Sequence, residues 1–230
     1  MQKDFHTFAK SLNLTFSDLM LLRQAFTHRS YINEHRSEAR EHNERLEFLG
    51  DAVLELASTQ FLFEKFPKHS EGDLTAFRAA LVNAVTCAEV ASRLGMNDYL
   101  LLSKGESKDQ GRARGVLLAN AFEALIGAIY LDQGYEAARA FIAEHLFPKI
   151  DEIVKKKLWR DSKSTLQERV QDTEGVTPTY AVIEESGPDH DKQFIVGVYA
   201  SKTLLAQGSG KSKQEAEQAA AQAALEERGW

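Results

Sequence analysis

The chain has 230 residues, of which 43% are apolar and 27% are charged. These shares are typical of a soluble globular protein and exclude a disordered or collagen-like chain. At roughly 150 residues per domain, the length predicts one domain of ordinary size and a second, smaller one. The net charge of −6 argues, taken alone, against a nucleic-acid partner, because nucleic-acid-binding domains usually present a basic surface.

Cysteine usage and the terminus indicate the compartment. Cys87 is the single cysteine, which excludes an intrachain disulfide framework and argues against a cysteine-based zinc site. The first 14 residues carry several charges and lack the apolar core of a signal peptide. The most apolar stretch, Gly115–Leu131, is short for a membrane span and contains polar residues. We therefore expect a reduced, cytoplasmic protein with no membrane partner.

Residues 1–155 have the pattern of successive helices. Apolar residues recur there at three- and four-residue spacing, and glycine or proline stands between the segments. The predicted helical segments are Phe16–Phe26, His42–Phe66, Asp73–Leu94, Gly115–Gln133 and Tyr135–Leu158. This pattern predicts an all-α first domain over residues 1–155.

The pattern changes at the basic run Lys155–Lys157, which predicts either a linker over residues 156–161 or a solvated helix end. In residues 162–230 the pattern is different, because short segments in which apolar and polar residues alternate, as in strands, stand between two helical segments. The predicted elements are a helix at Ser164–Thr173, strands at Thr179–Glu184, Phe194–Ala200 and Thr203–Gln207, and an Ala-rich helix at Ser212–Arg228. This order predicts a small α+β domain of the type α-β-β-β-α.

A row of carboxylates marks the second helical segment. Glu44, Glu47 and Asp51 fall at about 0°, 300° and 340° on a helix, so they share one face. Such a stripe is most often a solvated acidic face. Gly50, however, stands inside this helix, where it costs about 1 kcal/mol relative to alanine and allows another segment to approach the backbone. The opposite face is predicted to be buried through Leu46, Leu49, Val53 and Leu54.

The fourth helical segment is apolar nearly all round, which predicts a buried helix. Its strongly polar residues, Asn120 and Glu123, stand three apart and therefore share a face. A buried carboxylate must be paired, protonated or bound to a metal ion. The alternative to a functional role is a structural hydrogen bond between Glu123 and Asn120 or a nearby arginine.

Taken together, the two helices predict one cluster made of Glu47, Asp51, Asn120 and Glu123. Hard oxygen ligands of this kind suit Mg²⁺ or Mn²⁺, and the absence of histidine and cysteine from the set makes zinc a poor candidate. Carboxylate-held metal pairs cleave phosphodiesters, because one ion generates hydroxide while the other stabilises the leaving oxygen.

A second candidate site lies in the small domain, where Gly208–Lys213 leads directly into the last helix. Ser212 is predicted to cap that helix, and Glu215 stands three residues later, as in a capping box. The free N–H groups and the dipole of a helix N-terminus attract anions, and Lys211 and Lys213 add positive charge there. The alternative is a plain capped helix on a surface loop.

A nucleotide-binding P-loop is excluded, because Leu205 stands where that pattern requires glycine. The last 70 residues hold seven Lys and Arg against twelve Asp and Glu. Phosphate binding would therefore depend on the start of the last helix. His190, in the loop Gly187–Lys192, is either a further polar contact or an ordinary loop residue.

The segment His42–Asp51, with the sequence HNERLEFLGD, resembles the signature helix of bacterial ribonuclease III. Ala119–Leu131 resembles the second metal-binding helix of that family. Residues 162–228 resemble a double-stranded-RNA-binding domain, including its Gly-rich loop and Ala-rich last helix. The resemblance covers essentially the whole chain in the order of the family.

This resemblance implies a homodimer in which each subunit cuts one strand of an RNA duplex during rRNA or mRNA precursor processing. The products would carry a 5′-phosphate and a two-nucleotide 3′ overhang. Catalysis would depend on Mg²⁺, with Mn²⁺ as a substitute. The resemblance implies metal binding by Glu47, Asp51, Asn120 and Glu123, with Asp51 also positioning or activating water and with support from Glu44 and Glu71.

For the small domain, the resemblance implies that Gln167, Glu168 and His190 face the minor grooves of the duplex. Lys211 and Lys213 would meet the phosphates across the intervening major groove. This mode of binding reads the A-form shape and the 2′-hydroxyl groups more than the base sequence.

Two positions depart from the pattern of the family. Asn120 stands where the family usually has aspartate, so the cluster of four would carry −3 instead of −4, which predicts weaker Mg²⁺ binding and slower cleavage. Gln214 stands where lysine is common, which predicts weaker RNA binding. The first departure motivates an alternative function, a duplex-RNA-binding protein with a silent nuclease site. A metal-dependent hydrolase of small phosphates is a third hypothesis, but the carboxylate helices have no Gly-rich cradle beside them.

Overall fold

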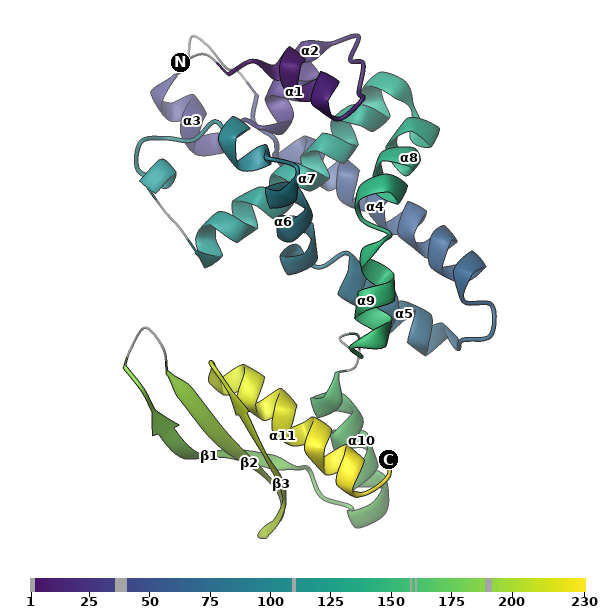
Figure 1. The fold of residues 1–230 in the computed structure, drawn as a ribbon, viewed down its shortest axis with the longest axis vertical. Coiled ribbons are helices and arrows are strands. Elements are labelled where there is room, and N and C mark those ends of the chain that lie inside the picture. Colours follow the sequence, from purple (N-terminus) through teal and green to yellow (C-terminus); the bar gives the residue numbers. More distant parts are fainter. Residues whose placement is uncertain (1–2, 36–40, 109–110, 158, 160, 189–191) are drawn as a thin grey trace. The chain divides into compact units, whose positions relative to one another are not determined.

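The computed structural model describes residues 3–35, 41–108, 111–157, 159, 161–188 and 192–230. The chain divides into two compact units, Met1–Trp159 and Arg160–Trp230. The first unit is helical, and the second has the order α-β-β-β-α (Figure 1). The predicted fold class is confirmed.

The first unit is built around one long helix, α7. Its residues Phe122, Leu125 and Ile129 are fully buried, and it packs against α2, α4, α6 and α8. The described α-helices are α1 (Phe5–Ser11), α2 (Leu19–Ala25), α3 (Arg29–Glu34), α4 (Glu44–Lys65), α5 (Glu71–Leu81), α6 (Ala84–Arg93), α7 (Arg112–Gln133), α8 (Tyr135–His145) and α9 (Lys149–Lys155). Two short 3₁₀ turns, Met96–Tyr99 and Glu106–Lys108, precede α7. The prediction that α7 forms the core is confirmed.

Among the described residues, Ala113–Gln133 is the one helical stretch long and apolar enough to cross a membrane. Core helices of soluble proteins have the same length and composition. Here the helix is surrounded by other helices of its own unit, as expected for a core helix.

Two predicted segments prove to be pairs of helices. Asp73–Leu94 is divided into α5 and α6, because the side chain of Asn83 accepts a hydrogen bond from Thr86 N at 2.9 Å and starts a new helix. Tyr135–Leu158 is divided into α8 and α9 at Pro148, which has no N–H to donate to the preceding turn. The short helices α1 and α3, of seven and six residues, were not predicted.

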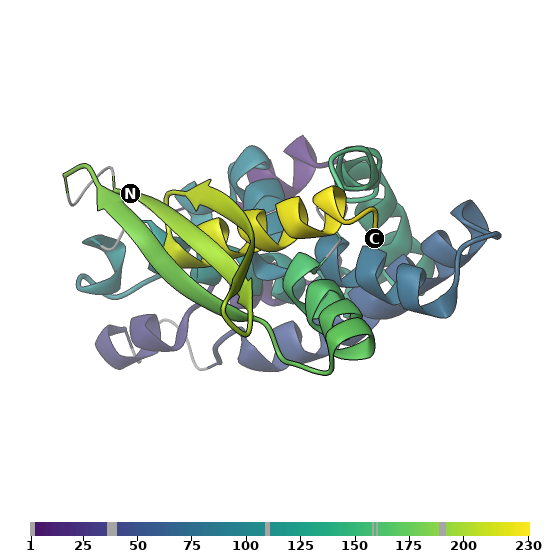
Figure 2. The same ribbon diagram turned by 90° about the horizontal axis from the view of Figure 1, so that it is seen from below.

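The second unit is a three-stranded antiparallel sheet in the order β1-β2-β3. Its elements are α10 (Ser162–Glu174), β1 (Thr179–Ser186), β2 (Gln193–Ala200), β3 (Thr203–Gly210) and α11 (Lys213–Glu227). Both helices contribute to the core on one face of the sheet, where Leu166 and Val170 of α10 meet Val198 of β2 and Ala220 of α11. Figure 2 shows α11, in yellow, across the sheet and α10, in green, beside α11.

The Gly-rich segment before α11 is part of the sheet, so the predicted end of the third strand at Gln207 is wrong. β3 continues to Gly210 and pairs with β2 throughout. A Cβ atom added at Gly208 would lie 2.1 Å from Ala220 N, and one at Gly210 would lie 2.6 Å from Ala216 N. These glycines allow the strand to rest directly on the backbone of α11.

The two tryptophans of the chain belong to different units. Trp159 closes the first unit, and its ring packs edge-on against Phe77 with the ring centroids 4.8 Å apart. Trp230 ends the second unit, packs against its core and lies 5.1 Å from the Arg228 guanidinium.

Candidate functional site

The candidate site forms where α4 crosses α7 in direct backbone contact. A Cβ atom added at Gly50 would lie 1.8 Å from the carbonyl oxygen of Glu123, and one at Gly127 would lie 2.2 Å from the carbonyl oxygen of Leu46. No side chain fits at either position. We call this contact of Gly50 with Gly127 the glycine crossing. It confirms that Gly50 admits a close neighbour.

The glycine crossing brings together four of the predicted site residues. Glu47 and Asp51 come from α4, and Asn120 and Glu123 come from α7. The side chain of Asn120 hydrogen-bonds to Glu47, and the charges of Asp51 and Glu47 act on Glu123. The alternative, a structural hydrogen bond of Glu123 to Asn120 or to a nearby arginine, is not among the interactions that shift the pKa of Glu123 in the described part of the chain.

The electrostatics of this cluster are those of crowded like charges. Burial, followed by the charges of Asp51 and Glu47, raises the pKa of Glu123 to about 7. Burial, Glu44 and Asp51 raise the pKa of Glu47, while the hydrogen bond from Asn120 lowers it. No Lys or Arg is among the groups that shift the pKa of Glu47 or the pKa of Glu123. A bound cation would therefore relieve repulsion that the folded chain leaves uncompensated.

The donor set fits a hard divalent cation by its chemistry, since it offers three carboxylates and one amide oxygen. Among the residues that the structure describes, no three His, Cys, Asp or Glu side chains are already grouped to hold a metal ion. The carboxylates would therefore have to turn toward the ion, with Asn120 as an additional ligand.

The two supporting acidic residues occupy different places. Glu44 lies next to the cluster, 3.5 Å from Arg29 and 3.8 Å from His42, and its charge acts on Glu47. Glu71 is exposed at the start of α5 and accepts a hydrogen bond from Thr75 Oγ1 at 3.3 Å. Its charge is not among those that shift the pKa of Glu47 or Glu123. The structure of one chain therefore does not bring Glu71 into the cluster.

Burial near the cluster is lower than predicted. Asn120 and Glu123 are half-buried, Asp51 is exposed, and Leu49 is only half-buried, while Leu46, Val53 and Leu54 are buried as predicted. The reason is that the carboxylate face of α4 and the end of the crossing remain open to solvent. A site that is open to solvent suits a large substrate better than a small molecule, which usually binds in an enclosed pocket.

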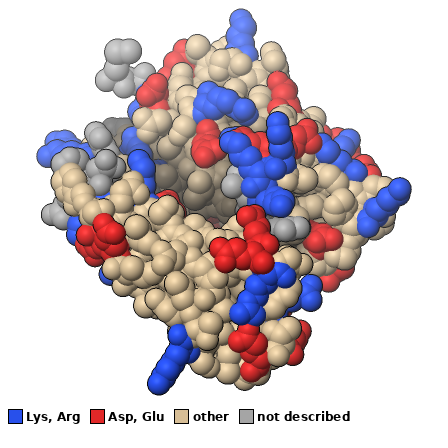
Figure 3. All heavy atoms as spheres, turned by 60° about the horizontal axis from the view of Figure 1, so that its bottom comes forward, with Lys and Arg blue, Asp and Glu red and all other residues tan. Residues whose placement is uncertain are grey.

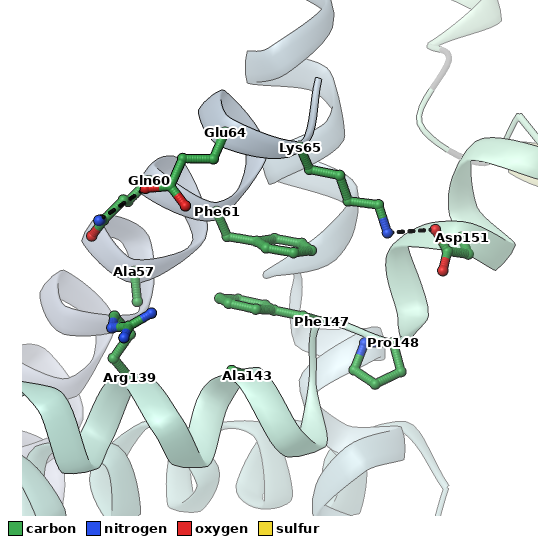
Figure 4. Close-up of a pocket in the computed structure, with 10 residues that line it drawn as sticks. All are labelled: Ala57, Gln60, Phe61, Glu64, Lys65, Arg139, Ala143, Phe147, Pro148 and Asp151. Carbon is green, nitrogen blue, oxygen red and sulfur yellow. Dashed lines mark hydrogen bonds and ion pairs between the residues drawn. The ribbon is translucent and has the colours of Figure 1, made fainter. Parts of the chain in front are cut away.

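A separate cleft of about 340 Å³ lies between α4, α8 and α9 (Figure 4). Phe61 and Phe147 stack at its centre with ring centroids 3.9 Å apart, and Lys65 pairs with Asp151 at 2.6 Å. It contains none of the predicted site residues. The candidate site and this cleft are therefore different places.

In the second unit, Gln167 and Glu168 are exposed on α10, and Lys211 and Lys213 are exposed at the start of α11. His190 lies outside the described residues. The structure therefore presents the four described RNA-contact candidates to solvent, and their contacts with RNA remain a prediction.

The predicted capping box at α11 is half right. Ser212 Oγ accepts a hydrogen bond from Glu215 N at 3.2 Å, as expected. The Glu215 carboxylate accepts from Lys211 N at 2.8 Å, one residue before the cap. The turn out of β3 points the Lys211 N–H toward the helix start, which explains the shift by one residue.

Three of the seven basic side chains in residues 161–230 form ion pairs between described residues. Lys163 pairs with Glu217 at 2.6 Å, and Lys192 pairs with Glu185 at 2.6 Å. Arg228 pairs with Glu174. On the face of the molecule shown in Figure 3, Lys and Arg are interspersed with Asp and Glu.

Comparison with known proteins follows the division into two units. Residues 18–150 match the family described as ribonuclease-III-like, and residues 162–228 match the double-stranded RNA binding motif. The chain is 50% identical over 222 residues to Ribonuclease 3 of Geobacillus thermodenitrificans, covering 96% of this chain and 90% of that protein. The chain belongs to the ribonuclease III family.

Other ribonuclease III proteins agree with this assignment. Ribonuclease 3 of Bacillus cereus is 48% identical over 221 residues, which cover 96% of this chain and 90% of that protein. A solved structure of the ribonuclease III nuclease domain from Campylobacter jejuni is 40% identical, with a TM-score of 0.57, and the match covers 63% of this chain and 99% of that one. The predicted membership of a family of hydrolytic endoribonucleases is confirmed.

One residue of the candidate site, Gly127, was not predicted from the sequence. Gly127 stands four residues after Glu123, in the interior of α7, where glycine is unfavourable. A glycine in the interior of a predicted helix was the signal that indicated Gly50 in α4, and Gly127 gives the same signal in α7. Gly50 and Gly127 considered together would have indicated that the two helices cross in contact.

Proposed function

We propose that the chain is a divalent-metal-dependent endonuclease that hydrolyses phosphodiester bonds of double-stranded RNA, in the manner of rRNA and mRNA precursor processing. Its products would carry a 5′-phosphate and a two-nucleotide 3′ overhang. The observation that supports this proposal is the glycine crossing. It crowds three carboxylates and Asn120 at an open surface, in a chain that also carries a double-stranded RNA binding motif.

Mg²⁺, or Mn²⁺ as a substitute, would supply an activated water and a stabilised leaving oxygen when bound. In this proposal Glu47, Asp51, Asn120 and Glu123 hold the metal. Asp51, on the exposed face of α4, would also orient water. Glu44, which lies near Arg29, completes the negative surface without being a ligand itself.

The second unit would place the duplex on this surface. Gln167, Glu168 and His190 would face minor grooves, and Lys211 and Lys213 would contact phosphates at the start of α11. This arrangement selects A-form duplexes by shape. It assigns RNA affinity to one unit and cleavage to the other.

The exposed apolar side chains of α4 support a homodimer. Phe48 is 81% exposed, Leu56 is 58% exposed and Phe63 is 71% exposed. On a helix they fall within about 80° of one another, and an exposed apolar row of this kind is typical of an interface. The nuclease domain from Campylobacter jejuni is described as flexible in a region involved in dimer formation. We infer that a second copy covers this row in a cytoplasmic dimer, so that each strand of a duplex meets one site.

An alternative function is duplex-RNA binding with a silent nuclease site. The observation that favours it is the hydrogen bond from Asn120 to Glu47. With an amide at this position the cluster has one negative charge fewer than four carboxylates would have, so metal binding is weaker.

One experiment separates the two functions. A radiolabelled RNA duplex is incubated with the native chain and with Asn120→Asp, in Mg²⁺ and in Mn²⁺. Cleavage by the native chain that disappears in Glu123→Ala supports the endonuclease. Cleavage by Asn120→Asp alone supports the binding protein with a silent site.

Two further outcomes would overturn the proposal. If neither chain cuts while both still bind the duplex, the nuclease function is wrong. If the native chain hydrolyses a small phosphate ester at a rate that excess duplex RNA does not change, the third hypothesis, a hydrolase of small phosphates, is favoured.

A further inference from the structure

The glycine crossing lies inside the candidate site itself. Gly50 is flanked by Glu47 and Asp51 on α4, and the atom nearest to its added Cβ is the carbonyl oxygen of Glu123, a site residue. Gly127 follows Glu123 by about one turn. The two glycines also face each other, because the added Cβ of Gly50 would lie 2.8 Å from Gly127 N and that of Gly127 would lie 3.1 Å from Gly50 N.

Glycine at these two positions has a cost that the rest of α7 avoids. A glycine in a helix interior costs about 1 kcal/mol relative to alanine, and α7 uses alanine at its other small buried positions, Ala119, Ala121, Ala124 and Ala128. A further glycine of α7, Gly115, is different, since its added Cβ would meet nothing closer than Ala88 Cβ at 4.0 Å. Backbone contact therefore occurs at Gly127 and is absent at Gly115.

We propose that Gly127, together with Gly50, is a positioning residue that sets the separation of α4 and α7 so that side chains of both helices reach one metal ion. This inference rests on the proposed metal-dependent function. Neither glycine would touch the metal or the RNA. Their contribution is the distance between the backbone that carries Glu47 and Asp51 and the backbone that carries Glu123.

The distances show how large the effect of a methyl group would be. In Gly127→Ala the new Cβ must retreat from 2.2 Å to ordinary contact with the Leu46 oxygen, which begins near 3.4 Å. The obstacle is backbone, so α4 and α7 must move apart by roughly 1 Å. Mg²⁺ requires ligands close to about 2.1 Å in near-octahedral geometry. A displacement of this size removes the ligands of one helix from the reach of those of the other.

The test compares Gly127→Ala with Gly115→Ala, a matched control in the same helix. Isothermal titration calorimetry without RNA measures the affinity of each intact chain for Mg²⁺ and Mn²⁺, and circular dichroism records folding. We expect Gly127→Ala to lose roughly 10- to 100-fold in metal affinity, as when a ligand's support is removed. Gly115→Ala should keep its affinity. Duplex-RNA affinity should be unchanged in both.

A compensating substitution separates positioning from general destabilisation. In the Gly127→Ala background, Asp51→Glu lengthens one side chain by a methylene group and should regain part of the lost metal affinity. In the native background the same substitution should weaken binding. A purely structural role of Gly127 would give Asp51→Glu the same effect in both backgrounds.

A second measurement does not depend on the folding of Gly127→Ala. At a fixed helix separation, both a longer and a shorter carboxylate should fit poorly, so Asp51→Glu and Glu123→Asp in the native chain should each lower metal affinity by about tenfold. Native affinity in both variants would overturn the inference. So would native affinity in a folded Gly127→Ala chain.

These results are distinguishable from failure of the proposed function. If the native chain binds neither Mg²⁺ nor Mn²⁺, the metal-dependent function fails and the inference fails with it. If the native chain binds metal and cleaves RNA, and the glycine variants bind metal as tightly as the native chain does, the function stands. The positioning role alone is then wrong.

Discussion

Both units of the chain use glycine to bring two backbones into contact, and the results differ. In the first unit, Gly50 and Gly127 join two helices whose neighbouring side chains are carboxylates. In the second unit, Gly208 and Gly210 join a strand to α11, where the contacting residues are three alanines, Ala216, Ala219 and Ala220, and Glu215. The first contact concentrates negative charge, and the second completes an apolar core. A close backbone contact is therefore functional or structural according to the side chains beside it.

The largest effect should come from removing charge at the first contact. Glu47→Gln keeps the size of the side chain but lowers the charge of the cluster, so metal-dependent cleavage should fall by roughly 100-fold. Duplex binding, which we assign to the second unit, should change little. Cleavage rates and gel-shift affinities on the same duplex measure both quantities. Equal losses of cleavage and binding would contradict the division of labour between the units.

The second contact should matter for stability instead of chemistry. In Gly208→Ala the new Cβ would lie 2.1 Å from Ala220 N, so β3 must move away from α11. Overpacking of this kind typically costs about 1–3 kcal/mol. Differential scanning calorimetry should show a lower transition for the second unit and an unchanged one for the first. Ser209→Ala, at the next and exposed position of β3, is the control, and an equal loss there would refute the packing explanation.

A smaller effect is expected at the start of α11. Lys213→Ala should weaken duplex binding by less than about tenfold, equally for all sequences, and lower the salt dependence by about one released counterion. Binding constants measured over a range of KCl concentrations test this. Lys202→Ala removes an exposed lysine at the opposite end of β3 and should leave the slope unchanged. Identical slopes for the native chain and Lys213→Ala would exclude Lys213 as a phosphate contact.

The smallest effect is a pH dependence in metal-free protein. The folded-state pKa of Glu123 is raised from an ordinary 4.5 to about 7, so the folded chain binds this proton more tightly than the unfolded chain does. The associated stability is fully present below about pH 4.5 and is lost as pH rises toward 7.

Glu123→Gln does not titrate, so its advantage in Tm over the native chain should grow between pH 5 and pH 8 in EDTA. Each kcal/mol regained corresponds to about 2–4 °C in a chain of this size. Thermal unfolding followed by circular dichroism at the two pH values measures it. An advantage that is the same at both pH values would show that repulsion around Glu123 is not the cause.

The sequence predicted those features that depend on local pattern. The carboxylate face of α4, the buried face opposite it and the α-β-β-β-α order all follow from periodicity within one segment. The break between α5 and α6 was missed, because apolar spacing continues across Asn83 while the chain direction changes at its cap. The role of Gly127 was missed for another reason, since a glycine at a close contact has meaning only when its partner helix is known.

The candidate site shows the same limit. Glu47, Asp51, Asn120 and Glu123 could be grouped from two helical faces, because each face was evident in its own segment. Glu71 could not be placed, since its position depends on how the chain turns between α4 and α5, where no repeating pattern exists. The extension of β3 to Gly210 was likewise not predicted, because a glycine-rich sequence is typical of loops. These residues pair with β2 and pack against the backbone of α11, and neither contact is visible in the sequence of the segment.

The placement of the two tryptophans has a practical consequence for following this molecule in solution. Trp159 is held against Phe77 in the first unit, and Trp230 lies by Arg228 in the second. Trp159→Phe leaves an emission spectrum that belongs to the second unit alone, and Trp230→Phe leaves one that belongs to the first. Each unit thus carries its own intrinsic fluorophore, and the unfolding of either can be recorded without labelling the chain.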